Sequence, residues 1–347
     1  MGLHMKFDRG TLRGIAGVVA SLMIIAGIHF VKPGVSAAPN FPCGQSSGDA
    51  VAVDIHSGES GASIGLDLAR LGIVKSSEAF FRIAVSDPRA GSIAPGVHMI
   101  EKRLCSSEAL NQLLDNARIS NLLAVPEGAW NSEIKKSLTE IGYSASEISQ
   151  AFRNHPIPIG FKSLEGLLFP AQYSFDSSTS VSEIISLMVN RGLFEVEKAG
   201  LNSSKEKFTS AQLLIIASLV QAEGDEKDYA KISQVVRNRL RIGMPLQFDS
   251  TIHYIKGSRG SVFLSTQSTI LRSPYNTYRN YGLPPTPINN PGASALFAAT
   301  HPEDGPWLYF ITVAPGDTRF TNTLDEFNTW KVLYKKNLKA GKFRSSK

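Results

Sequence analysis

The sequence has few of the residues on which most metal and redox sites depend. Its 347 residues include two cysteines, Cys43 and Cys105, and seven histidines. The cysteines form no CxxC pair, no cysteine–histidine cluster has zinc spacing, and neither HExxH nor a P-loop GxxxxGKS/T string occurs. These absences argue against metallopeptidases and P-loop nucleotide hydrolases, and we expect no metal or organic cofactor.

The spacing of the two cysteines leaves their state open. In an exported protein, Cys43 and Cys105 could form one disulfide that ties an N-terminal segment to the first domain. The alternative is two free thiols, because nothing in the spacing shows that the two positions meet in space.

The sequence also has no block of like charge. The net charge of +6 is spread along the chain, and no nucleic-acid-binding motif accompanies it. We therefore expect no nucleic acid partner, whereas an anionic cell envelope suits the charge equally well. Hydrophobic residues make up 42% of the chain, enough for a packed core, and the length allows two modest domains plus a membrane segment.

The serine-hydrolase string GxSxG occurs at residues 61–65, which read GASIG. A nucleophile elbow requires a sharp turn from a strand into a helix at the serine. Ser63 lies well beyond a predicted strand that ends near Ile55, so we interpret Ser63 as a helix N-cap and not as a nucleophile.

The N-terminus has the pattern of a membrane segment. Residues 1–13 carry three basic residues and one acid, and residues 14–31 are almost wholly apolar. The positive-inside rule then predicts a single-pass protein of the cell membrane, with a cytoplasmic N-terminus and the rest of the chain extracytoplasmic. The small residues at 35–38 suit a cleaved signal peptide, which is the alternative, but the length of the apolar run favours a retained anchor. Residues 32–49 read as a linker.

The exported part is predicted to be α+β, with a small α/β module at 50–121 and a larger mixed domain at 122–340. Alternation and capping patterns predict strands at 51–55, 91–102, 122–125 and 307–313, and helices at 63–71, 76–85, 106–117, 131–141, 144–153, 181–199 and 324–338, with 209–241 largely helical. No fixed-period repeat is present, which excludes a solenoid.

The most informative segment runs from Ser210 to Gly224. Its apolar residues cover enough of the surface for a buried helix, and Gly224 is suited to end it. Glu223 then lies in the last turn, where partial burial and the negative end of the helix dipole both disfavour the ionised carboxylate. A protonated glutamate near neutral pH can protonate the leaving oxygen of a glycosidic bond. On these physics alone, an ordinary exposed glutamate at a helix end is the commoner case.

Polar and aromatic residues cluster downstream of this helix. Residues 246–254 alternate, so that in an extended segment Gln247, Asp249 and Thr251 would share one face suited to sugar hydroxyl and acetamido groups. A polar-faced edge strand explains the pattern equally well. Residues 275–278 read YNTY, which suits sugar recognition, although two structural tyrosines are the commoner explanation. Asn238 lies near an apolar stripe, where its amide needs partners.

Taken together, these motifs resemble the endolytic murein transglycosylases of the YceG-like (MltG) family. The resemblance runs from the N-terminal apolar segment almost to the C-terminus. The matching pieces, in chain order, are LEG and FP (164–170), IASLV leading to Glu223 (216–223), NRL with GM and LQ (238–247), DST with Tyr254 (249–254), YNTY (275–278), GLPP (282–285), Ile288 with PG (288–292), and AA with HP (298–302).

The resemblance implies a membrane-anchored peptidoglycan lytic transglycosylase, a lyase, with a LysM-like module at 50–121 and a YceG-like catalytic domain at 122–340. It implies that Glu223 serves as both acid and base. The substrate-binding residues carried over are Asn238, Gln247, Asp249, Thr251, Tyr254, Tyr275, Asn276, Thr277 and Tyr278. The implied partners are peptidoglycan glycan strands, the cytoplasmic membrane and peptidoglycan synthases acting on nascent strands.

The chain departs from the family pattern at four positions. A glutamate common two residues before the catalytic one is Gln221 here, which cannot titrate, and the threonine common after it is Gly224. Two histidines common near the C-terminus are replaced by Thr318 and Phe327. Two alternatives remain: a muramidase that hydrolyses the same bond with Glu223 and Asp249, and a wall-binding scaffold without activity.

Overall fold

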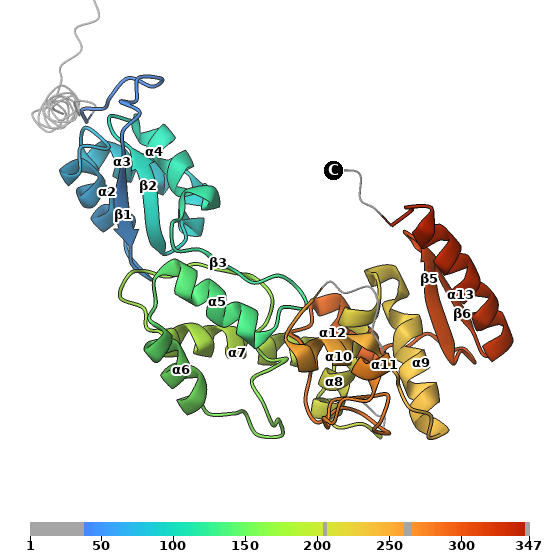
Figure 1. Ribbon diagram of the computed structural model, residues 1–347. Helices are drawn as coiled ribbons and strands as arrows, with labels where there is room; N and C mark the ends of the chain where they lie inside the picture. Colours follow the sequence, from blue (N-terminus) through green and yellow to red (C-terminus); the bar gives the residue numbers. More distant parts are fainter. Residues whose placement is uncertain (1–37, 204–206, 260–265, 344–347) are drawn as a thin grey trace, which may run out of the picture. The chain divides into compact units, whose positions relative to one another are not determined.

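The computed structural model describes residues 38–203, 207–259 and 266–343, which form helices and three two-stranded sheets (Figure 1). This is a mixed α+β architecture, as the sequence predicts. The predicted anchor at 14–31 lies outside the described residues. Within the described part of the chain, no helix is long and apolar enough to cross a membrane.

The chain divides into two compact units. Of the described residues, the N-terminal unit contains 38–53, Gly58–Ile93 and Met99–Arg118, and the C-terminal unit contains Asp54–Ser57, Ala94–His98 and those from Ile119 onwards.

The N-terminal unit is built on the paired strands β1 (Ala50–Ile55) and β2 (Gly96–Glu101). Between them lie α2 (Gly61–Arg70), α3 (Ser77–Ser86) and the short η1 (Pro88–Ser92), and after them come α4 (Ser106–Leu113) and η2 (Asn116–Arg118). The apolar faces of these elements meet in a core in which Leu68, Phe80, Ile100 and Leu110 are buried. Burial of such side chains is the main favourable contribution to folding of a unit this small.

Two sequence predictions for this unit need correction. Ser60, and not Ser63, caps α2, because its extended backbone lets its hydroxyl accept the N–H of Ser63 at 3.2 Å. The strand predicted at 91–102 is shorter, because Pro88 begins a 3-10 turn capped by Asp87 and the strand starts only at Gly96.

The two cysteines form a disulfide within the N-terminal unit. Cys43 and Cys105 are separated by 62 positions, and their Cα atoms lie 5.0 Å apart. Of the two states that the sequence left open, a disulfide and two free thiols, the structure has the disulfide.

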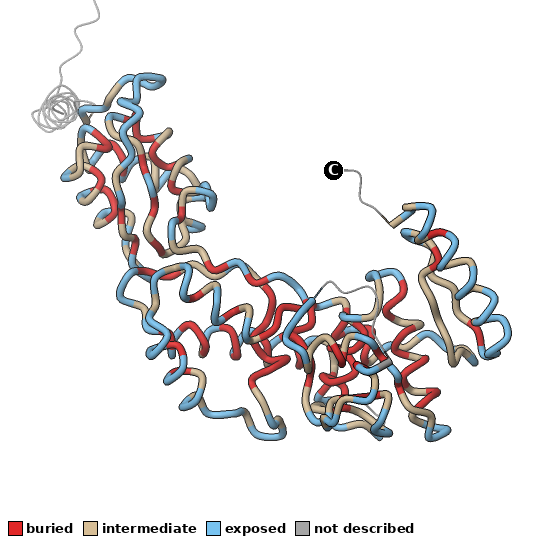
Figure 2. Tube along the Cα trace, viewed as in Figure 1, coloured by how far each residue is buried: buried red, intermediate tan, exposed pale blue. Residues whose placement is uncertain are grey.

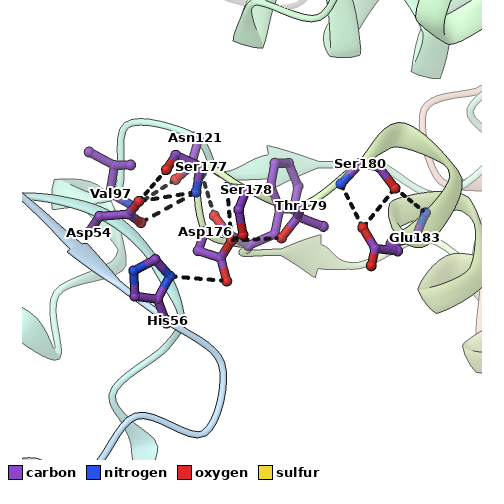
Figure 3. Close-up of polar contacts among 11 residues, drawn as sticks. Asp54, His56, Val97, Asn121, Asp176, Ser177, Ser178, Thr179, Ser180 and Glu183 are labelled. Atoms are coloured by element: carbon purple, nitrogen blue, oxygen red, sulfur yellow. Dashed lines mark hydrogen bonds and ion pairs between the residues drawn. The ribbon is translucent and has the colours of Figure 1, made fainter.

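Residues 54–57, at the end of β1, and residues 94–98, at the start of β2, belong to the C-terminal unit. Figure 3 shows the polar contacts that hold them. The Asp54 carboxylate accepts hydrogen bonds from the hydroxyl and the N–H of Ser177, the latter at 3.3 Å. The Asn121 side chain accepts the Val97 N–H at 2.9 Å and donates to the Phe175 carbonyl. These bonds fix both segments onto the chain at 175–177.

The C-terminal unit begins with a helical layer. Strands β3 (Leu123–Ala124) and β4 (Gln172–Tyr173) pair antiparallel, and α5 (Asn131–Ile141), α6 (Ala145–Asn154) and α7 (Val181–Lys198) bury a common core. Ser144 and Ser180 form capping boxes at the starts of α6 and α7. Gly142, with φ of 116°, ends α5.

The centre of this unit is α8 (Ser210–Glu223), whose residues Leu213 to Val220 are all buried. A helix that is apolar all round must be enclosed by other elements. Helices α9 (Tyr229–Arg241), α10 (Asp249–Lys256) and α12 (Ala293–Thr300) pack against it. Figure 2 shows the buried positions concentrated here.

The chain ends in a β-hairpin covered by a helix. Strands β5 (Tyr309–Ala314) and β6 (Asp317–Thr321) pair antiparallel, with Tyr309 opposite Thr321. Helix α13 (Leu324–Lys339) packs along both strands (red in Figure 1). The short helix α11 (Thr266–Thr269) follows α10 in the chain.

Candidate active site

The position of Glu223 is fixed by the way α8 begins and ends. The Thr209 hydroxyl accepts the Gln212 N–H at 3.3 Å and the Gln212 side chain accepts the Thr209 N–H at 2.9 Å, a capping box that starts the helix. The chain leaves α8 in an extended conformation at Gly224, where a Cβ atom would collide with Ile232 of α9. Glu223 is therefore the last helical residue, as the sequence predicts.

Glu223 opens into a pocket of about 550 Å³. Helices α8, α9 and α10 contribute one side, and β5 and α13 contribute the other. The lining residues are Glu223, Arg239, Gln247, Phe248, Asp249, Thr269, Tyr278, Tyr309, Phe310, Ile311, Leu324, Phe327, Lys331, Tyr334 and Lys335. A pocket of this size has room for a small part of an extended ligand, such as one or two sugar rings.

The surroundings of Glu223 favour its protonated form. The pKa of Glu223 is raised to about 7: desolvation is the main cause, the hydrogen bonds from Ser250 oppose it, and the charge of Asp249 adds to the rise. The Ser250 hydroxyl donates to Oε1 of Glu223, and the Ser250 N–H points at the same oxygen from 3.4 Å. A carboxyl with a pKa near neutral can donate a proton in one step and accept one in the next.

The residues that meet Glu223 do not form the extended segment that the sequence predicts. The chain turns into α10 at Asp249, because the Thr277 hydroxyl accepts the Phe248 N–H at 2.9 Å and holds Phe248 as the residue before the helix. The N–H groups of a first helical turn have no partner within the helix, and one of them, from Ser250, is aimed at Glu223. The end of α8 thus faces the start of α10.

Three of the residues predicted to bind substrate line the pocket: Gln247, Asp249 and Tyr278. The Tyr278 hydroxyl donates to Oδ1 of Asp249, and desolvation raises the pKa of Tyr278, so its phenol keeps its proton. Gln247 is exposed and adopts a φ of 51°, which is uncommon for a residue other than glycine. Its N–H donates to the Thr277 carbonyl at 3.0 Å, which holds this unusual conformation in place.

The other six lie outside the lining of this pocket, and four of them are buried. Asn238 is 1% exposed, and its amide donates to the carbonyls of Gly305 at 2.8 Å and Trp307 at 2.9 Å. Asn276 donates to the carbonyls of Thr269 and Leu271 at 3.0 and 2.8 Å. The structure thus uses these amides to hold loops.

Thr251 and Thr277 belong to the same interior. The Thr251 hydroxyl donates to the Phe248 carbonyl at 2.7 Å and lies 3.0 Å from the Thr277 hydroxyl. Because Asp249 and Thr251 lie in a helix and not in a strand, they do not share a face with Gln247, and Thr251 turns into the core.

Tyr254 and Tyr275 pack against each other, with ring centroids 5.2 Å apart, and Trp130 meets Tyr254 edge-on at 6.0 Å. The Tyr254 hydroxyl donates to Glu165 at 3.2 Å, and the Tyr275 hydroxyl lies 2.7 Å from that of Thr286. Tyr254 belongs to α10, so these contacts tie that helix to Trp130, Glu165 and the loop at Tyr275.

Arg239 is the main pocket residue that sequence reasoning missed, because arginines on its helix read as solvent-facing. Its guanidinium donates to the carbonyls of Leu246 and Leu308, the latter at 2.6 Å, and lies over the Tyr309 ring at 5.5 Å. It joins α9, the loop before α10 and β5. The only available signal was its place in the NRL motif at 238–240.

Gln221, which replaces a glutamate common in the family, is turned away from the carboxyl of Glu223. Its amide donates to the Tyr229 hydroxyl at 2.7 Å, and its carbonyl accepts the Gly292 N–H at 2.9 Å. Phe327, which replaces a histidine, lines the pocket. Thr318, which replaces the other, lies on β6 beside Thr312, with their hydroxyls 3.0 Å apart.

Known proteins match the chain over most of its length. A Bacillus subtilis protein named endolytic murein transglycosylase is 34% identical over 315 residues, which cover 84% of this chain and 87% of that protein. A Streptococcus pneumoniae protein of the same name is 28% identical over 322 residues, covering 82% of this chain and 58% of that protein. The crystal structure of a yceG-like protein from Listeria monocytogenes superposes with a TM-score of 0.53 at 26% identity, covering 81% of this chain and 98% of that one.

The sequence model of the YceG-like family matches residues 53–332, a range that includes Glu223 and every residue of the pocket except Tyr334 and Lys335. The chain therefore belongs to the YceG-like family.

Proposed function

We propose that this chain is a peptidoglycan lytic transglycosylase that cuts glycan strands internally and leaves 1,6-anhydro ends. The observation that carries the proposal is Glu223, whose pKa is raised to about 7 at the edge of a pocket large enough for sugar rings. The names of the Bacillus and Streptococcus relatives support the substrate class.

In the proposed reaction, the protonated carboxyl of Glu223 donates its proton to the oxygen that joins N-acetylmuramic acid to N-acetylglucosamine. The bond from the anomeric carbon to that oxygen then breaks. The C6 hydroxyl of the muramic residue attacks the anomeric carbon, and the Glu223 carboxylate takes the hydroxyl proton. Because the nucleophile belongs to the substrate, no second carboxylate is needed to activate water.

The neighbours of Glu223 would keep its pKa near neutral, so that both its protonated and its ionised form are accessible during this cycle. The Ser250 donors stabilise the carboxylate that forms after the first step, whereas desolvation and Asp249 favour the return of the proton. Asp249, held by Tyr278, is also placed to stabilise positive charge that develops at the anomeric carbon. No metal or organic cofactor enters these steps.

Hydrolysis of the same bond is a second candidate, because Asp249 lines the pocket together with Glu223. The two reactions are separated by mass spectrometry of the products from uncrosslinked glycan strands digested with the full-length chain. The lytic reaction yields ends that are lighter by one water than the reducing ends of hydrolysis. Reducing ends would refute the lytic reaction, and release of no fragments by either parent or Glu223→Gln protein would favour a wall-binding scaffold.

The proposal extends to where the enzyme works. We place it in the cytoplasmic membrane, anchored by residues 14–31, with the rest outside, beside peptidoglycan synthases and acting on nascent strands. The Cys43–Cys105 disulfide supports an oxidising compartment. In the N-terminal unit, two paired strands, β1 and β2, have helices α2 and α3 between them in the chain, and this order supports a LysM-like module at 50–121. Protease added to intact spheroplasts should digest the chain beyond residue 38, and full protection would contradict this topology.

A further inference from the structure

Helix α13 turns one face towards the catalytic carboxyl. Its pocket-lining residues Leu324, Phe327, Lys331, Tyr334 and Lys335 recur every three or four positions, which is the spacing of a single helical face. Burial, and after it the charge of Asp249, raise the pKa of Tyr334. Tyr334 is therefore within electrostatic reach of Asp249, and this face forms the wall opposite α10.

The wall has an aromatic part and a basic part. The rings of Phe327 and Tyr309 stack with centroids 5.4 Å apart and an interplanar angle of 30°, and both line the pocket. Lys331 lies one helical turn beyond Phe327, and Lys335 lies one turn beyond Lys331. A sugar ring resting against the stacked rings would thus have its substituents beside the two ammonium groups.

The two lysines have no acidic partner in the part of the chain that the structure describes. Both are exposed, and no described carboxylate lies within ion-pair distance of either. Arg239, deeper in the same pocket, adds a third positive charge. The acidic residues that line the pocket are Asp249 and Glu223, and Glu223 is partly neutral near pH 7. The mouth of the pocket therefore carries an excess of positive charge.

We propose that Lys331 and Lys335 bind a carboxylate carried by the glycan strand and so select strands with a charged substituent. The proposal rests on the function proposed above. Two groups of the substrate have this chemistry: the lactyl carboxylate of a stem-free muramic residue, and the carboxylates of a stem peptide. An ammonium on a flexible stem suits either one, because it pairs with a carboxylate as a point charge without a fixed geometry.

Both lysines are exposed, so the contact is solvated, and it takes no part in breaking the bond; it should contribute to binding in the ground state and the transition state alike. Its loss should raise KM and leave kcat unchanged. For two exposed ion pairs, the expected rise in KM is about three- to tenfold, and salt should reduce it through screening.

The test uses the full-length chain and four uncrosslinked glycan substrates. Two carry stem peptides, with their carboxylates either free or converted to neutral amides, and two are stem-free, with the lactyl carboxylate either free or amidated. The variant is Lys331→Gln with Lys335→Gln. The matched control is Lys336→Gln with Lys339→Gln, which removes the same charge from exposed residues of α13 outside the pocket lining.

The expected result is a higher KM for the pocket variant than for the parent on at least one free-carboxylate substrate, and no difference on its amidated counterpart. The substrate pair that shows the effect identifies the stem peptide or the lactyl group as the source. An unchanged KM on both free-carboxylate substrates, an equal rise on amidated strands, or the same rise in the control variant would each overturn the proposal.

These outcomes are separable from failure of the proposed function. If the parent leaves reducing ends, or if Glu223→Gln cleaves as well as the parent, the lytic assignment fails whatever the lysines do. If the parent makes anhydro ends in a Glu223-dependent way, but KM changes neither on substitution of the two lysines nor on amidation of the carboxylates, only the present inference fails.

Discussion

Two glutamates of the C-terminal unit, Glu165 and Glu223, have similarly raised pKa values in very different surroundings. Desolvation is the main cause that raises the pKa of both Glu165 and Glu223 to about 7. Glu223 opens into the pocket described above. Glu165 is 5% exposed, and it accepts hydrogen bonds from the Asn131 N–H at 3.0 Å, the Tyr254 hydroxyl at 3.2 Å and the Asn290 amide at 3.4 Å.

The comparison shows that a raised pKa alone does not define a catalytic acid. Both carboxyls are partly protonated near neutral pH, but the donors around Glu165 come from three separate segments of the chain. Glu165 therefore joins the start of α5, α10 and the segment before α12, whereas Glu223 is satisfied by one residue and keeps an open side. Access to the pocket is what separates the two roles, and this can be tested by matched substitutions.

The largest effect is expected from Glu223→Gln compared with Glu165→Gln. Removal of the proton donor at 223 should lower kcat by about 10²- to 10⁴-fold, the usual contribution of a positioned acid or base. The same change at 165 should leave most of the activity, because Glu165 does not line the pocket around Glu223. Release of labelled glycan fragments measures both, and a comparable loss in the two variants would erase the distinction.

The next effect concerns stability and pH. A carboxyl whose pKa is higher in the folded state than in the unfolded state stabilises the protein at low pH, and this contribution is lost as pH rises through the folded pKa. For Glu165 the window runs from about 4.5 to about 7. Because a glutamine side chain does not titrate, the stability of Glu165→Gln relative to the parent should improve by up to about 3 kcal/mol between pH 5 and 8. Urea unfolding at both pH values measures this, and a pH-independent difference would contradict it.

Asp249→Asn should change the pH profile of the reaction. The negative charge of Asp249 helps to raise the pKa of Glu223, so its removal should ease ionisation of Glu223. The acid form is then lost at lower pH, and the alkaline limb of the kcat/KM profile should move to lower pH. An unmoved limb with a large loss of kcat would instead assign Asp249 a direct part in the chemistry, as the hydrolytic alternative requires.

A shift in the opposite direction is expected from Ser250→Ala. The Ser250 hydroxyl stabilises the ionised form of Glu223, so its loss should raise the pKa and move the alkaline limb to higher pH. The backbone N–H of residue 250 remains in place and limits the change. In pH profiles of kcat/KM, the alkaline limbs of the Asp249→Asn and Ser250→Ala variants should lie on opposite sides of the parent limb. Shifts in the same direction would contradict the assignment.

The parts of the fold that local signals specify are those that the sequence predicts. Helix α5 has the predicted bounds, 131–141, because Gly142 ends it in the left-handed conformation. The end of α8 at Glu223 follows from Gly224 by another route, because Gly224 is extended and a Cβ atom there would collide with Ile232. These elements carry their start and stop signals within a few residues, so no tertiary information is needed.

The remaining parts depend on contacts between distant segments. The segment at 246–254 alternates like a strand, but Thr277, nearly thirty positions away, accepts the Phe248 N–H and helix α10 follows. Strand β6 and helix α12 were not anticipated, because residues 293–300 and 317–321 carry no strong periodic signal. The wall that α13 adds to the pocket exists only once the C-terminal hairpin has folded against α9 through Arg239.

The bond between Cys43 and Cys105 also changes the covalent topology of the chain. A backbone cut anywhere between these residues leaves everything before Cys43 joined to everything after Cys105. A single cut between Cys43 and Cys105 therefore cannot by itself separate the two sides, whereas a cut within residues 106–118 of the same unit would. Separation after a cut inside this loop needs a second event, reduction of the disulfide.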